Sequence, residues 1–352
     1  MKKGNKLPVL PFAGSNTIHF IRLLIRNKVS GIIGFLRLLY VLLVQITYSN
    51  FLWLLKKRAP EMNNLKNHHI VFIIGHWRSG TTFMHRLLAS YDGFSTVSNA
   101  AAFSFPSIDN RFSSILKRVV SLHLPHTRPM DWIPMTTEEP QEDEFILMST
   151  SQHATYHGWH FPDKFLYYFQ RYCLGSGLEY KEKQTFIADY KNLINEMINT
   201  TPKKRLLLKN PCNTGRIDWL AKEFPNAKFI YLHRDAEETI QSSIHLHNTL
   251  IERFGFYKTD RNIESDVRTL HKQLMVKYED DKCSIDKNSI LEIAYFDLIN
   301  TPDEIIKNVA DFISIDHKVF INERFKQLIK ENKTAPRRLY KQSNSVEIPL
   351  AG

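Results

Sequence analysis

A glycine-containing loop between an apolar run and a helical pattern constrains this chain more than any other feature. In FIIGHWRSGTTFMHRLL, Gly75 follows a run typical of a buried strand, and Gly80 directly precedes the helical pattern. Glycines let the backbone approach a ligand closely, and a helix N-terminus adds positive potential, so this turn suits an anion. The sequence therefore favours a phosphate-binding loop over a strand–turn–helix corner that binds nothing.

The spacing of the two glycines is that of a Walker A loop, but the residues that follow differ. Thr81 and Thr82 stand where a nucleotide kinase or ATPase has lysine and then serine or threonine, and the positive charge is Arg78 instead. The loop therefore lacks the lysine that reaches the terminal phosphates of a Mg-nucleotide. This disfavours a P-loop kinase of a small molecule. Such a kinase stays open as an alternative function.

Beyond Pro60, short β-rich runs alternate with helical patterns, which predicts an α/β fold. We expect a P-loop-like three-layer domain with a central parallel sheet flanked by helices. Helical spacing marks a helix in IDWLAKEF, and Thr301, Pro302 and Glu304 form a capping-box start for another. The expected strands are IVFIIG from Ile70, RLLLK from Arg205, KFIYLH from Lys228 and ILEIAY from Ile290.

The N-terminal region from Ile18 to Leu55 is strongly apolar. Its second part, Leu38 to Leu55, carries no charge and has the minimum length of a membrane span, although Gln45 and Asn50 weaken that case. Three interpretations are open: a helical hairpin packed on the main domain, an interfacial membrane-docking segment, and a true span. The N-terminal segment MKKGNKLPVLPFAG is not typical of a cleaved signal peptide, because its apolar stretch is short and is interrupted by Pro8 and Pro11.

The net charge of +11 implies an anionic partner, but it does not choose among a nucleotide, an acidic membrane surface, nucleic acid and an acidic polymer. Lysine and arginine are spread through the chain instead of lying with aromatics along one face, which argues against nucleic acid. The three cysteines form no CxxC pair, so neither a disulfide framework nor a zinc site is indicated. We expect a cytoplasmic location, with or without membrane association.

At the glycine loop the chain resembles the sulfotransferase family, and the form GHWRSGTT is most similar to its bacterial members. The resemblance extends from the N-terminal helices to about Ile315. It implies 3′-phosphoadenosine-5′-phosphosulfate (PAPS) as sulfuryl donor, PAP as product, and no metal. Region 60–335 is then the sulfotransferase domain, between an apolar helical region at 1–59 and a basic tail at 336–352. Five residues match the family's 5′-phosphosulfate loop position by position: Arg78, Ser79, Gly80, Thr81 and Thr82.

A second motif, KFIYLHRDAEETIQSS, places Arg234 at the end of an expected strand and Ser242 eight residues later in a helix. An arginine there suits a phosphate at the edge of an open sheet, but it could equally pair with Asp235 or Glu238 at the surface. Sulfotransferases hold the 3′-phosphate of PAPS with arginine and serine at this spacing. The resemblance therefore implies that role for Arg234 and Ser242.

Sulfuryl transfer is an in-line displacement at sulfur, which requires a base, alignment and charge stabilisation at the leaving oxygen. The resemblance implies that Lys209, at the end of RLLLK, follows the transferring oxygens; a solvent-exposed strand-end lysine is the alternative. It also implies that Tyr295 lies by the adenine. Phe296 departs from the family's Tyr-Glu-Asp-like segment there, and a core aromatic is the alternative for Tyr295.

The general base is not the family's usual histidine, because Pro211 occupies the position two residues after the lysine. A carboxylate should replace it, and TTEEPQEDEFIL offers a cluster that we expect to open a helix near Pro140. Acids in a first turn also stabilise the helix dipole without any chemistry. The candidates are Glu142 first and Glu144 second, in a cluster with Asp143, and His76, His123 and His126 are held in reserve.

The acceptor is indicated only by composition. The segment between His153 and Tyr172 contains eight aromatics and three histidines, which suits either an apolar acceptor pocket or an ordinary core layer. Together with the apolar N-terminal region, it favours a small-molecule or lipid acceptor such as a sterol, lipid or phenol. A carbohydrate is the alternative acceptor, and peripheral membrane contact through the N-terminal helices is compatible with either.

Overall fold

The structure is a computed structural model of the 352-residue chain, and it describes residues 10–55, 65, 68–104, 113–200 and 204–334. The predicted basic tail at 336–352 lies outside the described residues.

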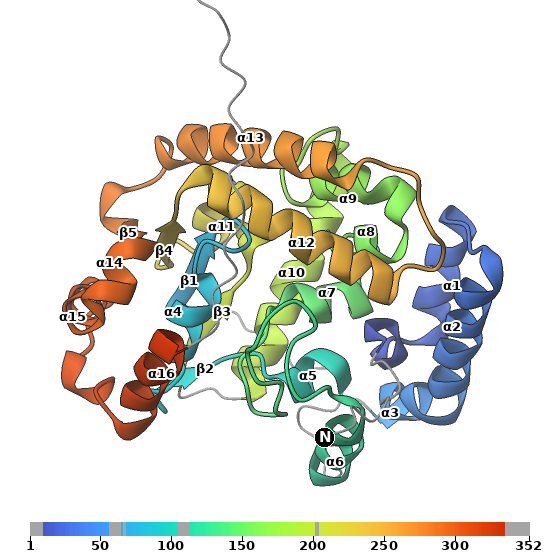
Figure 1. The fold of residues 1–352 in the computed structure, drawn as a ribbon, viewed down its shortest axis with the longest axis horizontal. Helices are drawn as coiled ribbons and strands as arrows, with labels where there is room; N and C mark the ends of the chain where they lie inside the picture. Colours follow the sequence, from blue (N-terminus) through green and yellow to red (C-terminus); the bar gives the residue numbers. More distant parts are fainter. Residues whose placement is uncertain (1–9, 56–64, 66–67, 105–112, 201–203, 335–352) are drawn as a thin grey trace, which may run out of the picture.

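A parallel five-stranded sheet forms the centre of the molecule, with strand order β2-β3-β1-β4-β5. Helices cover both of its faces (Figure 1), so the predicted α/β fold is confirmed. All four predicted strands are present, although Tyr295 begins a helix instead of ending a strand. The strands are β1 (Ile70–Gly75), β2 (Phe94–Ser95), β3 (Arg205–Lys209), β4 (Lys228–His233) and β5 (Ile290–Ala294).

Alternate side chains of the central strands enter two different cores. In β1, Phe72 packs on one face of the sheet and Ile73 on the other, and every residue of the strand is buried. A strand with both faces covered needs a continuous apolar run, which IVFIIG supplies. The core that contains Ile73 includes α4 (Thr81–Leu88), α14 (Tyr295–Asn300), α15 (Pro302–Phe312) and α16 (Glu323–Thr334).

The core on the other face is larger and contains most of the remaining helices. The two longest of them are α10 (Tyr180–Thr200) and α13 (Ile263–Lys282), and α13 packs against α12 (Ala236–Phe254). The shorter helices are α5 (Asn99–Ser104), α6 (Ser113–His123), α7 (Glu144–Thr150), α8 (His157–His160), α9 (Phe165–Tyr172) and α11 (Ile217–Glu223).

The N-terminal helices pack on this same larger core, on the side of the molecule away from α14, α15 and α16 (Figure 1). Phe12, Phe20 and Val41 are fully buried, and Phe20 contacts the ring of Phe256. Among the described residues, no helix has both the length and the apolar character needed to cross a membrane. The elements are α1 (Thr17–Arg26), α2 (Gly31–Val44), the π-helical η2 (Gln45–Ser49) and α3 (Asn50–Leu55), preceded by the 3₁₀ turn η1 (Pro11–Gly14).

Two local predictions were wrong. The helix expected near Pro140 begins at Glu144, because the preceding residues pair with a distant segment: Pro140 forms an antiparallel bridge with Ser98, and the Gln141 amide donates to the Val97 carbonyl. The capping box also fails, since Thr301 donates its hydroxyl to a carbonyl in the preceding turn instead of capping α15.

Candidate functional site

The glycine loop lies at the carboxyl edge of the sheet, where it joins β1 to α4. Gly75 and Gly80 have positive φ angles of 138° and 101°. A Cβ atom on Gly75 would lie 2.3 Å from the Leu232 carbonyl oxygen, and one on Gly80 would lie 2.3 Å from the Tyr295 ring. Both positions therefore require glycine on grounds of conformation and of space.

The loop presents hydrogen-bond donors at the start of α4. The first turn of a helix leaves its backbone N–H groups without intrahelical partners, and here these belong to residues such as Thr81 and Thr82. The Ser79 hydroxyl is buried and has no hydrogen-bond partner among the described residues. Since buried polar atoms are normally paired, this hydroxyl is an unsatisfied group within the loop.

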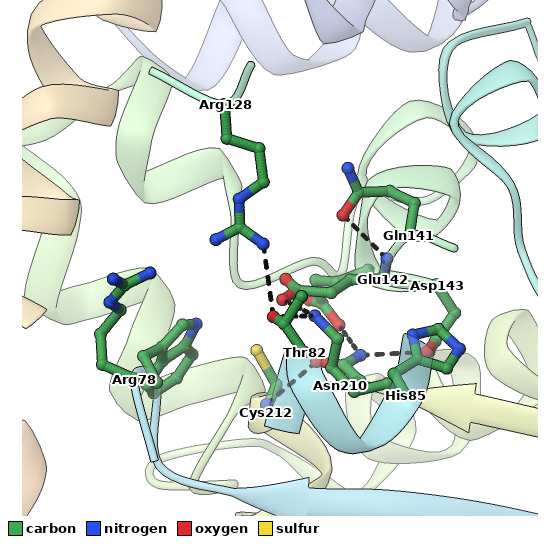
Figure 2. A network of polar contacts seen from close by, with 12 residues as sticks. Arg78, Thr82, His85, Arg128, Gln141, Glu142, Asp143, Asn210 and Cys212 are labelled. Atoms are coloured by element: carbon green, nitrogen blue, oxygen red, sulfur yellow. Dashed lines mark hydrogen bonds and ion pairs between the residues drawn. The ribbon is translucent and has the colours of Figure 1, made fainter. Parts of the chain in front are cut away.

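Two arginines share one carboxylate beside the loop. Arg78 pairs with Asp131 at 2.7 Å, and Arg128 pairs with the same carboxylate oxygen at 3.1 Å. Burial acts to raise the pKa of Asp131, but the charges of Arg128 and Arg78 outweigh it and the pKa is lowered. Arg128 also donates to the Thr82 hydroxyl at 3.3 Å, as Figure 2 shows. The cluster thus holds one anionic group between two cations.

The structure brings Ser242 into contact with Arg78. Arg78 Nε donates to the Ser242 hydroxyl at 2.9 Å. Arg234 pairs with Glu238 at 2.6 Å, which is the surface pairing that the sequence left open, and its guanidinium lies 4.8 Å from the centre of the Tyr295 ring. Tyr295 in turn packs on Gly80, so Arg234 is linked to the glycine loop through this ring.

Lys209 ends β3 and is buried against the candidate base. Its ammonium pairs with one carboxylate oxygen of Glu142, and the Tyr156 hydroxyl donates to the other. The ammonium also lies 3.5 Å from the Thr82 hydroxyl. Burial lowers the pKa of Lys209 and Arg128 adds to this, against the opposing charge of Glu142. The alternative of a strand-end lysine in solvent is therefore wrong.

Glu144 lies in a different environment from Glu142. It is fully buried and paired with Arg216 through two contacts, of 2.8 and 3.1 Å. Asn210 donates to Glu144 at 2.9 Å and to Asp143 at 3.1 Å. Burial raises the pKa of Asp143 to about 6, although the hydrogen bonds from Tyr190 and Asn210 oppose the shift. Figure 2 shows Asp143 and Asn210 beside Glu142.

An open pocket joins the glycine loop to an apolar wall, and Glu142 is part of its lining. Of the aromatic segment between His153 and Tyr172, only Trp159 lines this pocket, and most of its other aromatics are buried in the core. Polar and loop residues that line it include Arg78, Gly80, Thr81, Thr82, Arg128, Asp131, Gln141, Arg234 and Tyr295. Apolar ones include Phe103, Met130, Met135, Phe145, Trp159, Leu246, Leu250 and Phe254.

The reserve histidines do not line this pocket among the described residues. His76 belongs to the loop itself and is buried there, and desolvation lowers its pKa to about 3. His123 lies at the end of α6 and His126 is exposed in the segment after it. In the part of the chain that the structure describes, no three side chains are grouped to hold a metal ion, and the absence of a metal stays a prediction.

Several residues of the site were not predicted from the sequence. Arg128 and Asp131 lie in an irregular segment without a recognisable motif, and Tyr156 belongs to the aromatic segment whose members the sequence could not tell apart. Asn210 stands next to Lys209, and an amide directly after a strand-end lysine was the one signal that could have indicated it.

Comparison with known proteins gives concordant findings. A family model described as "Sulfotransferase family" matches residues 71–318. Two relatives, from Mycobacterium tuberculosis and Mycobacterium bovis, are 27% identical over 312 residues, which is 86% of this chain and 78% of theirs. Both are named omega-hydroxy-beta-dihydromenaquinone-9 sulfotransferase Stf3.

Two solved structures share the fold. Sulfotransferase STF1 from Mycobacterium tuberculosis has a TM-score of 0.59 at 18% identity, over 76% of this chain and 72% of that one. Sulfotransferase STF9 from Mycobacterium avium has a TM-score of 0.59 at 14% identity, over 77% and 69%.

Proposed function

The chain belongs to the sulfotransferase family, and from this membership we propose that it transfers the sulfuryl group of PAPS to the hydroxyl of a lipophilic alcohol. The chain is a sulfotransferase, and its family uses PAPS as the donor. The kinase alternative is not supported, since the loop lacks the Walker lysine and the chain belongs to another family.

The glycine loop supports the donor site. Its glycines bring the backbone close to any bound group, and the unpaired Ser79 hydroxyl and the start of α4 offer donors to a 5′-phosphosulfate. Arg78 and Arg128 hold an anionic group, Asp131, between them. A bound phosphate or sulfate has a charge of the same sign, so it suits the same two arginines. We assign the loop from Arg78 to Thr82 to this end of PAPS.

The 3′-phosphate is assigned to Arg234 and Ser242, with Tyr295 beside the adenine. Arg234 is now paired with Glu238, and both side chains are partly exposed. Exposed ion pairs contribute about 0–1 kcal/mol, so a doubly charged phosphate can displace this carboxylate at small cost. Ser242 already contacts Arg78, which supports a shared phosphate pocket between the loop and α12.

The reaction is assigned to Glu142 and Lys209. Glu142 takes the proton of the acceptor hydroxyl, the acceptor oxygen bonds to sulfur, and the bond from sulfur to the 5′-phosphate oxygen breaks with its electron pair on that oxygen. Lys209, held near Thr82, offsets the charge that develops there. Glu144 is unsuited to this role, because a base must reach the proton it removes and Glu144 is enclosed with Arg216.

The acceptor is assigned as lipophilic because of what else lines the pocket. One observation carries the proposal: Glu142 lies in a single pocket that has the glycine loop and an apolar wall including Phe145 and Leu250. A sugar acceptor would require many polar partners in place of that wall. The names of these relatives specify a hydroxylated menaquinone derivative, which is a lipophilic alcohol.

We further propose that residues 60–335 form the sulfotransferase domain, since the family match at 71–318 lies within them. The helices at 1–59 precede it, and we propose that they make peripheral contact with a membrane from the cytoplasmic side.

Transfer of radiolabelled sulfate from PAPS to a panel of sterols, quinols, phenols and sugars tests this function. We expect label on lipophilic alcohols, and Arg234→Ala should weaken PAP binding about 10- to 100-fold through loss of a charged hydrogen bond. Arg268→Ala is the matched control, because Arg268 also pairs with a glutamate four residues away on a helix but does not line the pocket. Binding of Mg-ATP without binding of PAP contradicts the proposal.

A further inference from the structure

The N-terminal helices expose an unusual number of large apolar side chains. Twelve of the nineteen exposed large hydrophobic side chains of the described residues lie between Ile18 and Leu54. Five of them, Ile18, Ile25, Ile32, Ile46 and Leu54, are 67–84% exposed. We call the exposed apolar side chains of α1, α2, η2 and α3 the N-terminal apolar face. Exposed apolar side chains gathered in one region of a fold indicate a docking site.

The charge of this region of the sequence limits what can cover the face. Residues 1–60 contain ten lysines and arginines and no aspartate or glutamate, so they account for nearly all of the net charge of +11. On α1, the exposed Arg22 and Arg26 follow the exposed Ile21 and Ile25 directly. Apolar side chains bordered by basic ones suit the interface of an anionic bilayer. A second copy of the chain would bring the same positive charge to the contact, so charge repulsion disfavours a dimer through this face.

The face is held next to the apolar part of the pocket. Arg37 on α2 donates to the backbone carbonyls of Glu252 and Gly255, at the C-terminal end of α12. A Cβ atom on Gly34 would lie 1.8 Å from the Phe256 carbonyl oxygen, so α2 and this segment are in direct backbone contact. The same end of α12 supplies Leu250 to the pocket lining. Figure 1 shows α12 running from the sheet toward α1 and α2.

We propose that the N-terminal apolar face docks the enzyme on an anionic lipid bilayer, with the pocket close to the lipid. An acceptor dissolved in the bilayer then reaches Glu142 past the end of α12 without crossing water. The route of the acceptor rests on the proposed function, whereas the docking itself depends only on the face and its charge. The helices lie in the interface and no part of this docking requires a span.

Sedimentation of the full chain with lipid vesicles tests the docking. We expect binding to vesicles of phosphatidylcholine with phosphatidylglycerol, weaker binding to phosphatidylcholine alone, and loss of the difference at high salt. The double variant Ile25→Glu/Leu39→Glu should bind at least about tenfold more weakly, because it places two charges in the lipid-facing surface. Val276→Glu is the control, at an apolar residue of α13 that is as exposed as Leu39.

Light scattering and PAP binding complete the experiment. The docking is overturned if the wild-type chain does not bind anionic vesicles, if the double variant binds as well as Val276→Glu, or if the face is buried in a dimer that the double variant dissociates. PAP affinity should be the same in all three proteins. Vesicle binding without PAP binding contradicts the sulfotransferase assignment and leaves the docking standing, so the two failures are distinguishable.

Discussion

At the scale of single residues, two carboxylates close in sequence have opposite environments. Glu142 lies in the pocket, where Lys209 and Tyr156 hold its two oxygens. Glu144 is enclosed with Arg216, and removal of one partner from such a buried pair typically costs about 3–5 kcal/mol. We therefore assign chemistry to the first acid and structural support to the second.

Asp143, between them, predicts a pH dependence of stability. Its pKa of about 6 in the folded chain lies above the ordinary value of 3.8 because the group is buried. A carboxyl whose pKa is raised by folding stabilises the fold below its unfolded pKa and loses that contribution as the pH rises through its folded pKa. About two pKa units correspond to roughly 3 kcal/mol, so up to this amount is lost between pH 4 and 7.

The variant Asp143→Asn isolates this effect. Its amide oxygen can still accept the hydrogen bonds from Tyr190 and Asn210, while the ionisation is removed. In urea titrations, the difference in free energy of unfolding between variant and wild type should grow in favour of the variant from pH 4 to pH 7. Asp92→Asn, at a fully exposed carboxylate, is the control. A difference that does not change with pH contradicts the assignment.

The sequence located this acidic cluster and ranked Glu142 before Glu144, but it did not indicate which side chains pair with them. Arg216 lies 72 residues from Glu144, and no local pattern indicates which acid it pairs with. Arg234 illustrates both cases: its pairing with Glu238 is local and was an alternative that the sequence offered, whereas its contact with the Tyr295 ring depends on the position of the helix that follows β5. Contacts between residues far apart in the sequence are set by the packing of the fold, and a local motif does not predict them.

At the scale of elements, the loop between β1 and α4 depends on Gly80. In Gly80→Ala, the new Cβ atom meets the Tyr295 ring, so the ring or the loop must move. Gly175→Ala is a matched control, since Gly175 also has a positive φ but open space around it. Both variants should lose about 1–2 kcal/mol of stability from backbone strain. Calorimetry should show loss of PAP binding in Gly80→Ala alone, and equal affinities contradict the loop assignment.

The sequence predicted elements well where the pattern is local. The four apolar runs that became β1, β3, β4 and β5 are strands with the predicted starts, and the first three are largely buried. The two-residue β2 is too short to leave a pattern, and it is held by parallel pairing with β3. The predicted start of α7 was wrong because the bridge between Ser98 and Pro140 keeps the preceding residues out of the helix. The local sequence around Pro140 contains only one partner of that bridge, so it could not predict the bridge.

At the scale of the whole molecule, the parallel sheet gathers distant segments at one edge. The ends of β1, β3 and β4 bring the glycine loop, Lys209 and Arg234 together, as expected for ligand sites in open α/β sheets. The apolar lining of the pocket comes from α5, α7, α8 and α12, which are far apart in the sequence. The residues that we assign to the donor were therefore proposed from motifs, and the apolar lining that we assign to the acceptor required the fold.

The central claim is that Glu142 joins these two halves as the base. The most direct test is the turnover of labelled sulfate transfer from PAPS by Glu142→Gln, at saturating donor and acceptor, with PAP affinity measured on the same protein. Loss of a general base predicts a fall in kcat of about 10²- to 10⁴-fold with PAP affinity retained, while Glu138→Gln at an exposed site stays at the wild-type rate. Near wild-type turnover by Glu142→Gln contradicts the claim.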